Sequence, residues 1–363
     1  MKVPRRILVV ATLRIGDVLL TTPLIRSLRC AWPQASITVL VFDGTKGILQ
    51  NNPDVDEIIA VGRRSGLFEH LRLLWRLWRN YDLAISTMTN DRATLYARIG
   101  GKHAVGAIDA GAKHQWKRNL LTQYSETDVV TTHTVLNYLR LADLVGARRC
   151  YEVIVGWKDA HIATVRTAIP FDLDVQPYVV LHAYPMYVYK AWRQDAWVEL
   201  ANWLEEKGMR IVLTGGNDAT EMANVKALQQ LMPAGTVNVA GELGFSEVAY
   251  LLSKAQAYVG PDTVVTHLAA AVGTPTVALF GPSNPVKWGP WPKGYDKDEE
   301  PYHMVGTQYV GNVVLLQGGG DCVPCMEEGC DRHINSLSRC LQELSVTSVL
   351  MALSGLGAIV EDQ

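Results

Sequence analysis

The sequence contains no apolar run of about 18 residues, so we expect no segment that spans a membrane. It also lacks a G-x-G-x-x-G motif. The loop that follows the first apolar run holds only Gly16, which disfavours a nicotinamide or flavin cofactor. A formal net charge of −2 argues against general nucleic-acid binding. The apolar run near the N-terminus is short and has no suitable cleavage site, so we expect a buried first strand in a cytoplasmic protein.

The composition is that of a globular protein with a large core. The chain has 363 residues, 48% of them hydrophobic and 19% charged, and this length predicts two domains. Apolar runs alternate with helical patterns along the chain, notably at Ile7–Ala11, Ser36–Phe42, Tyr178–His182, Arg210–Thr214 and Thr276–Phe280. Repeated strand–helix units predict an α/β protein with two doubly wound, Rossmann-like domains.

The segment 169–177, IPFDLDVQP, contains two prolines and breaks both the helical and the strand periodicity. We therefore expect one domain over 1–168, a second over 176–345 and a C-terminal helix or tail over 346–363. Ligands of such sheets bind beyond the carboxyl ends of the strands, so the natural site is a cleft between the two domains.

The most informative segment is 259–283, VGPDTVVTHLAAAVGTPTVALFGPS. It predicts a strand, a tight turn and a helix that begins near Thr263. The free amides and the dipole of a helix N-terminus bind phosphate, the Thr263 hydroxyl adds a donor, and His267 lies one turn further on. We interpret this segment as the holder of a sugar-nucleotide diphosphate. The alternative is an ordinary strand–turn–helix that binds nothing.

Two charged residues follow predicted strands. Asp17 would accept the proton of an attacking sugar hydroxyl; alternatively it is the N-cap of a helix that begins at Val18. Lys190 would neutralise a departing diphosphate; alternatively it is an ordinary solvated lysine. In the second half, Thr214 and Gly215 end a strand where backbone could approach a ligand, and Glu247 would bind a ribose diol or only compensate a helix dipole.

Potential metal ligands are present, but we expect no metal. The pairs Asp54/Asp56 and Asp172/Asp174 each form a D-x-D tripeptide, which we interpret as structural. A cluster of cysteines near the C-terminus has a spacing that could chelate zinc. It comprises Cys322, Cys325, Cys330 and Cys340, and we expect reduced thiols there instead of a metal site.

The segment 68–79, FEHLRLLWRLWR, predicts a basic amphipathic helix. We favour a helix whose apolar face packs into the core; the alternative is contact with an anionic membrane surface. Arg63, Arg64 and the segment 113–118, KHQWKR, add positive charge to the same domain. Together they suit a phosphorylated or acidic acceptor. The apolar face of this helix would comprise Leu67, Leu71, Leu74, Trp75 and Trp78.

Several linked segments resemble one known family over nearly the whole chain. They are RRILVVATLRIGDVLLTTP at the start, then LTGGNDATE, then GPDTVVTHLAAAVGTPTVALFGPSNPVKWGPW. In this order they resemble the bacterial lipopolysaccharide heptosyltransferases of glycosyltransferase family 9, which have the GT-B fold. The first and last segments most resemble the heptosyltransferase III branch, which adds a side heptose to the inner core.

The resemblance implies a role for each matching residue. Asp17 would be the catalytic base, Lys190 would contact the donor phosphates or ribose, and Glu247 would bind the ribose. A D-[ST]-x-x-x-H donor signature is matched by Asp262, Thr263 and His267. The family normally has glycine where this chain has Val264, which keeps the amide but limits how closely backbone and ligand approach.

The implied function is inverting transfer of heptose from ADP-heptose to the lipid-anchored lipopolysaccharide core, with neither cofactor nor metal. The protein would work at the inner face of the inner membrane and bind no nucleic acid. The acceptor would be held by Arg63, Arg64, Lys117 and Arg118. Alternatives are transfer of another core heptose or nucleotide sugar, a sugar-nucleotide epimerase, and a non-catalytic carbohydrate-binding assembly protein.

Overall fold

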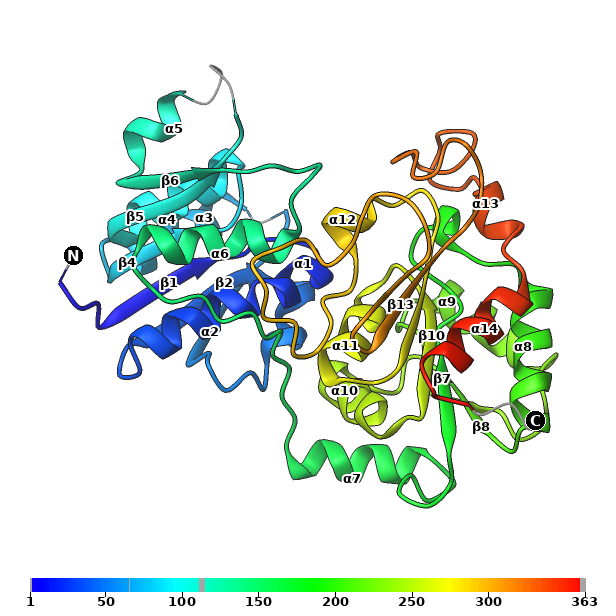
Figure 1. Cartoon of the computed structure of the whole chain (residues 1–363). Coiled ribbons are helices and arrows are strands. Elements are labelled where there is room, and N and C mark those ends of the chain that lie inside the picture. The colour runs from blue at the N-terminus through cyan, green and yellow to red at the C-terminus, as the bar shows by residue number, and fades with distance from the viewer. Residues whose placement is uncertain (1, 65, 111–114, 360–363) are drawn as a thin grey trace. The chain divides into compact units, whose positions relative to one another are not determined.

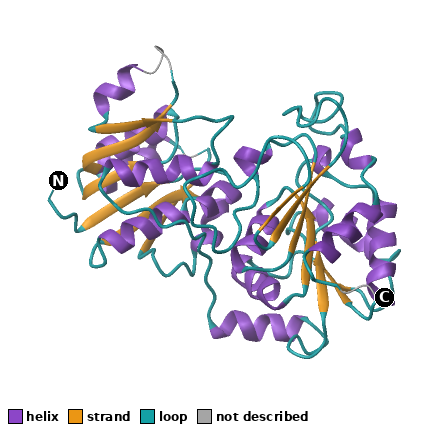
Figure 2. Ribbon diagram, viewed as in Figure 1, coloured by secondary structure: helices purple, strands orange, loops and turns teal. Residues whose placement is uncertain are grey.

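The computed structural model describes residues 2–64, 66–110 and 115–359. Contacts between Cα atoms divide the chain into two compact units. Unit 1 comprises Met1–Gly156 together with Asp296–Glu300, and unit 2 comprises Trp157–Tyr295 and Pro301–Gln363. Both are built on a mainly parallel sheet with helices on its two faces, as Figure 2 shows for each unit.

Unit 1 contains a six-stranded parallel sheet in the order β3-β2-β1-β4-β5-β6. Its strands are β1 (Arg6–Val10), β2 (Ser36–Phe42), β3 (Glu57–Val61), β4 (Tyr81–Ser86), β5 (Gly101–Ile108) and β6 (Gln123–Glu126). Its helices, labelled in Figure 1 except for the 3₁₀ helix, are α1 (Ile15–Leu20), α2 (Thr22–Ala31), the 3₁₀ helix η1 (Asp43–Leu49), α3 (Leu67–Leu77), α4 (Asp91–Gly100), α5 (Gln115–Leu120) and α6 (Thr134–Leu144).

Unit 2 contains a seven-stranded sheet in the order β12-β13-β11-β10-β7-β8-β9, parallel except for the β12–β13 pair. Its strands are β7 (Tyr178–Leu181), β8 (Arg210–Leu213), β9 (Val237–Asn238), β10 (Ala257–Pro261), β11 (Thr276–Phe280), β12 (Gln308–Val310) and β13 (Val313–Gln317). Its helices are α7 (Asp159–Ala168), the 3₁₀ helix η3 (Val188–Lys190), α8 (Gln194–Glu206), α9 (Ala219–Gln229), α10 (Phe245–Lys254), α11 (Val264–Val272), α12 (Pro285–Trp288), α13 (Arg339–Gln342) and α14 (Val346–Gly355).

The central strands are mainly apolar because helices cover both faces of each sheet. Every residue of Ile7–Val10 and of Val179–Leu181 is fully buried. The prediction of two doubly wound domains is confirmed, and the predicted strands Ser36–Phe42 and Thr276–Phe280 coincide with β2 and β11. Pro23 separates two short helices as expected, since it occupies the first turn of α2.

The order of the strands creates one topological switch point in each sheet. In unit 1 the chain leaves β1 toward β2 and β3 on one side, and β4 to β6 lie on the other side. In unit 2 the corresponding switch lies between β7 and β10. Ligands of doubly wound sheets bind beyond the carboxyl ends of the strands at such a point, because the connecting loops there diverge to opposite faces.

The division between the units falls twelve residues before the predicted end of the first domain, at Gly156 rather than at 168. The helix α7 lies within the predicted first domain, but it packs on α10 and belongs to unit 2. The predicted linker residues are also structured: Leu173 is buried, and Asp174 forms ion pairs with Arg166 and Lys254. Proline content therefore marked a turn inside unit 2.

The chain also departs from the predicted domains further on. The segment Asp296–Glu300 belongs to unit 1, where the Glu300 carboxylate accepts a hydrogen bond from the His133 amide at 2.7 Å. The predicted C-terminal helix or tail forms a helix, α14, and it belongs to unit 2, because Val349 and Leu353 are fully buried in the core of that unit. Residues 360–363 of that tail lie outside the described residues.

The basic helix predicted at 68–79 forms as α3, but its packing differs from our expectation. Leu73 and Leu77 face the core, whereas Leu71, Trp75 and Trp78 are exposed. The predicted core-packed face is therefore only partly right. Leu74 packs against the core, but the register that buries Leu77 turns the two tryptophans to solvent. The side chain of Leu67 lies outside the described residues. Across the ranges that the structure describes, no helix combines the length and hydropathy needed to cross a bilayer.

Candidate active site

The switch point of unit 2 brings together residues from the loops after β7 and β10. Lys190 ends η3 in the first loop, and Asp262 and Thr263 form the second loop, between β10 and α11. The Lys190 ammonium donates to the Asp262 carboxylate at 2.5 Å and contacts the Asp262 carbonyl oxygen at 3.3 Å. The Lys190 ammonium is thus held beside the start of α11, because Asp262 directly precedes the N-cap Thr263.

Asp262 is nearly buried, and opposing effects act on its carboxyl group. Burial alone would raise its pKa, but the charge of Lys190, the neighbouring His267 and a hydrogen bond from Ser283 outweigh it and leave the pKa below its ordinary value. Asp262 therefore stays ionised at neutral pH. As an anion it repels phosphate, and in the structure its carboxylate accepts a hydrogen bond from Lys190.

His267 lies one turn into α11 and is buried. Burial lowers its pKa to about 4, so the imidazole is neutral near pH 7. Its Nε2 lies 4.0 Å from the Asp262 carboxylate, which for a neutral ring is no ion pair. Its Nδ1 has no hydrogen-bond partner among the described residues. A neutral ring can donate one hydrogen bond to an anionic ligand without adding a buried charge.

The N-terminus of α11 has the geometry of an anion site. Thr263 is the N-cap in an extended conformation (φ −139°, ψ 171°), its side chain caps no amide, and the first turn holds no acidic residue. The first amides of a helix have no intrahelical acceptor. Thr263 and Val264 are partly exposed. Val264, which stands where the family has glycine, therefore leaves the start of the helix accessible. The predicted helix start is confirmed to within one residue.

The other predicted donor-binding residues lie around the same sheet edge. Thr214 follows β8 and is buried, with its hydroxyl 3.1 Å from His182 Nδ1. Gly215 is required by the protein's own packing, because a Cβ there would lie 2.9 Å from the Ala240 Cβ. Glu247, in the first turn of α10, has its carboxylate 3.9 Å from His161 Nε2.

In unit 1, Asp17 lies just beyond the carboxyl end of β1. The helix α1 begins at Ile15 with Arg14 as its N-cap, so Asp17 stands inside the first turn and does not cap a helix that begins at Val18. The capping alternative is therefore wrong. Asp17 is partly exposed, and its negative charge adds to burial in raising the pKa of Tyr138 on α6. The Asp17 carboxylate at the switch point is therefore not the N-cap of α1.

A pocket of about 530 Å³ opens at the same sheet edge of unit 1. The Lys117 side chain is buried in its wall, where the ammonium donates to the Thr89 carbonyl and pairs with Asp91 at 2.8 Å. Arg63 lies over the Phe42 ring, which also lines the pocket, at 5.2 Å from its centroid. Further lining residues are Thr12, Asn90, Arg92 and Asp109.

The predicted acceptor residues are therefore only partly brought together. Arg63 and Lys117 are both tied to this pocket, and Arg64 is exposed on the loop after β3. Arg118 points elsewhere: it pairs with Glu126 at 2.5 Å and lies over Tyr124. Lys113, which we counted in the same basic segment, lies outside the described residues.

The candidate metal ligands have structural partners. Asp54 pairs with Arg26 and Asp56 with Arg29, so the first D-x-D tripeptide ties a loop to α2. Burial and three neighbouring thiols raise the pKa of Cys340 to about 11. Within the described ranges, no group of three or more His, Cys, Asp or Glu side chains is arranged to hold a metal ion.

Comparison with known proteins now identifies the family. The model of glycosyltransferase family 9, the heptosyltransferases, matches residues 70–297. The chain belongs to glycosyltransferase family 9. This glycosyltransferase is 26% identical over 286 residues to lipopolysaccharide heptosyltransferase 3 of Escherichia coli K12, covering 76% of this chain and 82% of that protein.

Solved structures of low sequence identity share its fold. A family 9 glycosyltransferase from Veillonella parvula superposes with a TM-score of 0.77 at 19% identity, covering 97% of both chains. The E. coli heptosyltransferase WaaC, solved with ADP, gives a TM-score of 0.72 at 20% identity, covering 97% of this chain and 99% of that one. The two doubly wound units are those of the GT-B fold, as the sequence predicted.

Sequence reasoning missed two residues beside the donor motif. Ser283 hydrogen-bonds Asp262, and His182 is a buried histidine whose pKa burial lowers to about 4. His182 directly follows β7 and Ser283 lies shortly after β11. Position just beyond a buried parallel strand is the signal that could have found both residues.

Proposed function

We propose that this glycosyltransferase moves heptose from ADP-heptose to the inner core of lipopolysaccharide, as a heptosyltransferase III-like enzyme. One observation carries the donor half of the proposal. Lys190 is held by Asp262 beside the open N-terminus of α11, so an ammonium and a row of helix amides converge on one place. Diphosphate is the group that such a pairing of cation and helix dipole suits best.

The donor half is supported by the comparisons as well as by the geometry. WaaC, which shares the fold, was solved with ADP, and the E. coli relative is named a lipopolysaccharide heptosyltransferase 3. In our proposal Lys190, the amides of Thr263 and Val264 and the neutral His267 bind the diphosphate. Thr214, Gly215 and Glu247 line the remainder of the nucleotide site.

The acceptor half rests on unit 1. The acceptor hydroxyl attacks the anomeric carbon of the heptose, its proton passes to the Asp17 carboxylate, and the bond from that carbon to the diphosphate oxygen breaks. Inversion follows from attack on the face opposite ADP. Donors already in place where charge develops on the diphosphate stabilise the transition state, typically by about 3 kcal/mol for each one. Arg63, Arg64 and Lys117 would bind the phosphates and acidic sugars of the acceptor, whereas Arg118 pairs with Glu126.

Because that acceptor is anchored in lipid, we place the enzyme peripherally at the inner face of the inner membrane. The test is incubation with ADP-heptose and a truncated core lipid, followed by mass analysis. A gain of one heptose, with release of ADP, is expected. Release of ADP without a heavier lipid, or conversion of ADP-heptose to an isomer, would instead favour hydrolysis or the epimerase alternative.

A further inference from the structure

The helix α3 of unit 1 has two apolar faces. One face is used by the fold: Leu73 is 8% exposed and Leu77 fully buried. The other face is turned to solvent, with Phe68 88% exposed, Trp75 84% exposed and the C-cap Trp78 67% exposed. Such large apolar side chains, exposed together, mark an interaction site more often than a bare surface.

The exposed residues form one stripe. Phe68, Leu71 and Trp75 follow the spacing i, i+3 and i+7, which places them along a single side of the helix, and Trp78 extends that side beyond its last turn. We call Phe68, Leu71, Trp75 and Trp78 the α3 apolar surface. This stripe is not part of the hydrophobic core of unit 1, because α3 packs on that core through Leu73 and Leu77.

The charge around this surface selects the kind of partner. The segment 62–79 contains five arginines and one glutamate, in a chain whose overall formal charge is −2. Arg72, Arg76 and Arg79 are exposed next to the stripe; Arg76 pairs with Glu57, which leaves Arg72 and Arg79 as the outer charges. Tryptophan and phenylalanine flanked by arginine match the boundary between lipid headgroups and acyl chains.

We propose that the α3 apolar surface is the membrane-docking element of this enzyme, and that its partner is a bilayer rich in anionic lipid. The inference rests on the proposed lipid-anchored acceptor, since docking would keep unit 1 beside its substrate. The aromatic side chains enter the interface while the arginines stay at headgroup level. Each arginine near an anionic surface contributes about fivefold to the partition coefficient, and that part weakens with salt.

The test is co-sedimentation of the full chain with vesicles of phosphatidylcholine, either alone or mixed with phosphatidylglycerol. We expect strong binding only to the mixed vesicles. The variant Phe68→Ser/Trp75→Ser should bind vesicles about tenfold more weakly or worse, because it lacks the two bulky apolar side chains whose transfer from water to the lipid interface favours binding. Arg72→Gln/Arg79→Gln should instead remove most of the preference for phosphatidylglycerol. All four side chains are exposed, so the melting temperature should not change.

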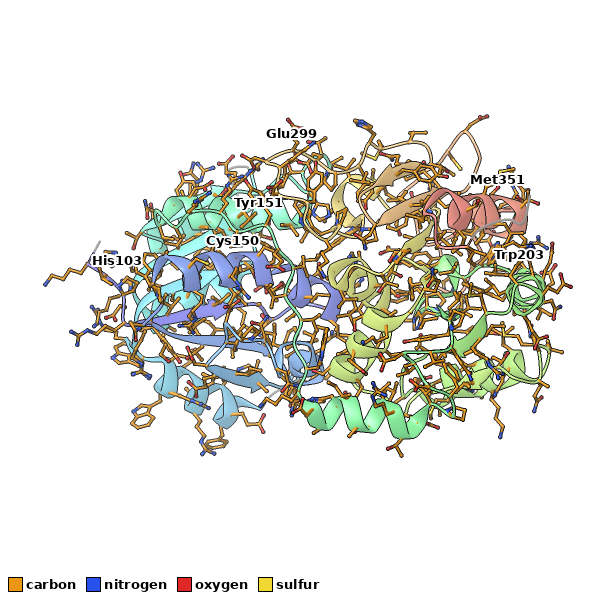
Figure 3. The ribbon with its side chains drawn as sticks, turned by 60° about the horizontal axis from the view of Figure 1, so that its bottom comes forward. His103, Cys150, Tyr151, Trp203, Glu299 and Met351 are labelled. Carbon is orange, nitrogen blue, oxygen red and sulfur yellow. The ribbon has the colours of Figure 1, made fainter. Side chains whose placement is uncertain are left out.

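A matched control removes two exposed apolar side chains elsewhere. Val129→Ser/Met351→Ser should bind vesicles like the parent; Figure 3 labels Met351, which is 64% exposed on α14. Equal vesicle binding by the parent and by Phe68→Ser/Trp75→Ser would overturn the inference. So would a parent that forms dimers and becomes monomeric in this variant without vesicle binding, because the surface would then join two copies of the chain.

Transfer assays separate this inference from the proposed function. With a deacylated, water-soluble acceptor the Phe68→Ser/Trp75→Ser variant should match the parent, and with acceptor in mixed vesicles it should be slower. A parent that transfers heptose but ignores vesicles would overturn the docking surface alone. A parent that binds vesicles through this surface yet transfers no heptose would overturn the proposed function and leave the docking surface supported.

Discussion

Replacing Lys190 by methionine separates two roles of one ammonium group. In the structure Lys190 neutralises Asp262, whose side chain is only 9% exposed, while Lys190 itself is 20% exposed. In the proposed function the same ammonium binds the donor diphosphate. Lys190→Met should therefore lower stability, because a nearly buried carboxylate loses its partner, and should also weaken ADP binding.

The two effects differ in size and in how they can be repaired. Removing one partner of a buried pair costs about 3–5 kcal/mol, and the partial exposure of Lys190 reduces this to roughly 2 kcal/mol. Loss of a charge-assisted hydrogen bond to the diphosphate costs about 1.5–3 kcal/mol, so the Kd for ADP should rise about tenfold to a hundredfold. The double variant Lys190→Met/Asp262→Asn should regain most of the stability, since no unpaired charge remains.

The assays are urea unfolding without ligand and calorimetric titration with ADP, on the parent, both single variants and the double variant. We expect the double variant to recover its unfolding free energy but not its affinity for ADP. If the double variant binds ADP as tightly as the parent, Lys190 acts only through Asp262, and the assignment of its ammonium to the diphosphate is refuted.

Three further outcomes are expected. Asp17→Asn should reduce kcat by about a hundredfold or more in the transfer assay, as for loss of a general base, while ADP affinity stays at the parent value because Asp17 belongs to unit 1. Arg63→Gln/Arg64→Gln should raise the KM for the core acceptor and leave the KM for ADP-heptose unchanged. Burial lowers the pKa of His182 and His267 from 6.5 to about 4, so the unfolded chain binds more protons between these values. The free energy of unfolding is therefore highest above pH 6.5 and falls toward pH 4, by roughly 2 kcal/mol per histidine near pH 5. In urea unfolding, His182→Gln or His267→Gln should show a shallower dependence of this free energy on pH. A pH dependence equal to that of the parent would contradict the assignment.

The parallel sheets could be predicted because their strands carry the strongest local signal. The strand β11 is fully buried and β2 is buried from Ile37 to Val41, so both are mainly apolar runs, and turn residues fix where they end. The short edge strands β9 and β12 were missed, since Val237–Asn238 and Gln308–Val310 have neither the length nor the apolar pattern to be recognised. β9 pairs with β8, about 25 residues earlier in the chain, and β12 pairs with β13, the strand that follows it.

The candidate site shows the same limit. The sequence predicted that Lys190 and Asp262 lie near the same ligand. It did not predict that they pair with each other, because the two residues are 72 positions apart in the chain. Periodicity showed that α3 is amphipathic, yet it could not show which of its two apolar faces the sheet would bury. That choice depends on the shape of the sheet surface beneath Leu73 and Leu77, which no local pattern contains.

The most direct test of the account is the product of the complete reaction. The enzyme is incubated with ADP-heptose and truncated core lipid, and the lipid is weighed by mass spectrometry beside a parallel reaction with Asp17→Asn. The account predicts a lipid heavier by one heptosyl unit with the parent enzyme and almost none with the variant. An unmodified lipid with the parent, or equal product from both proteins, would contradict it.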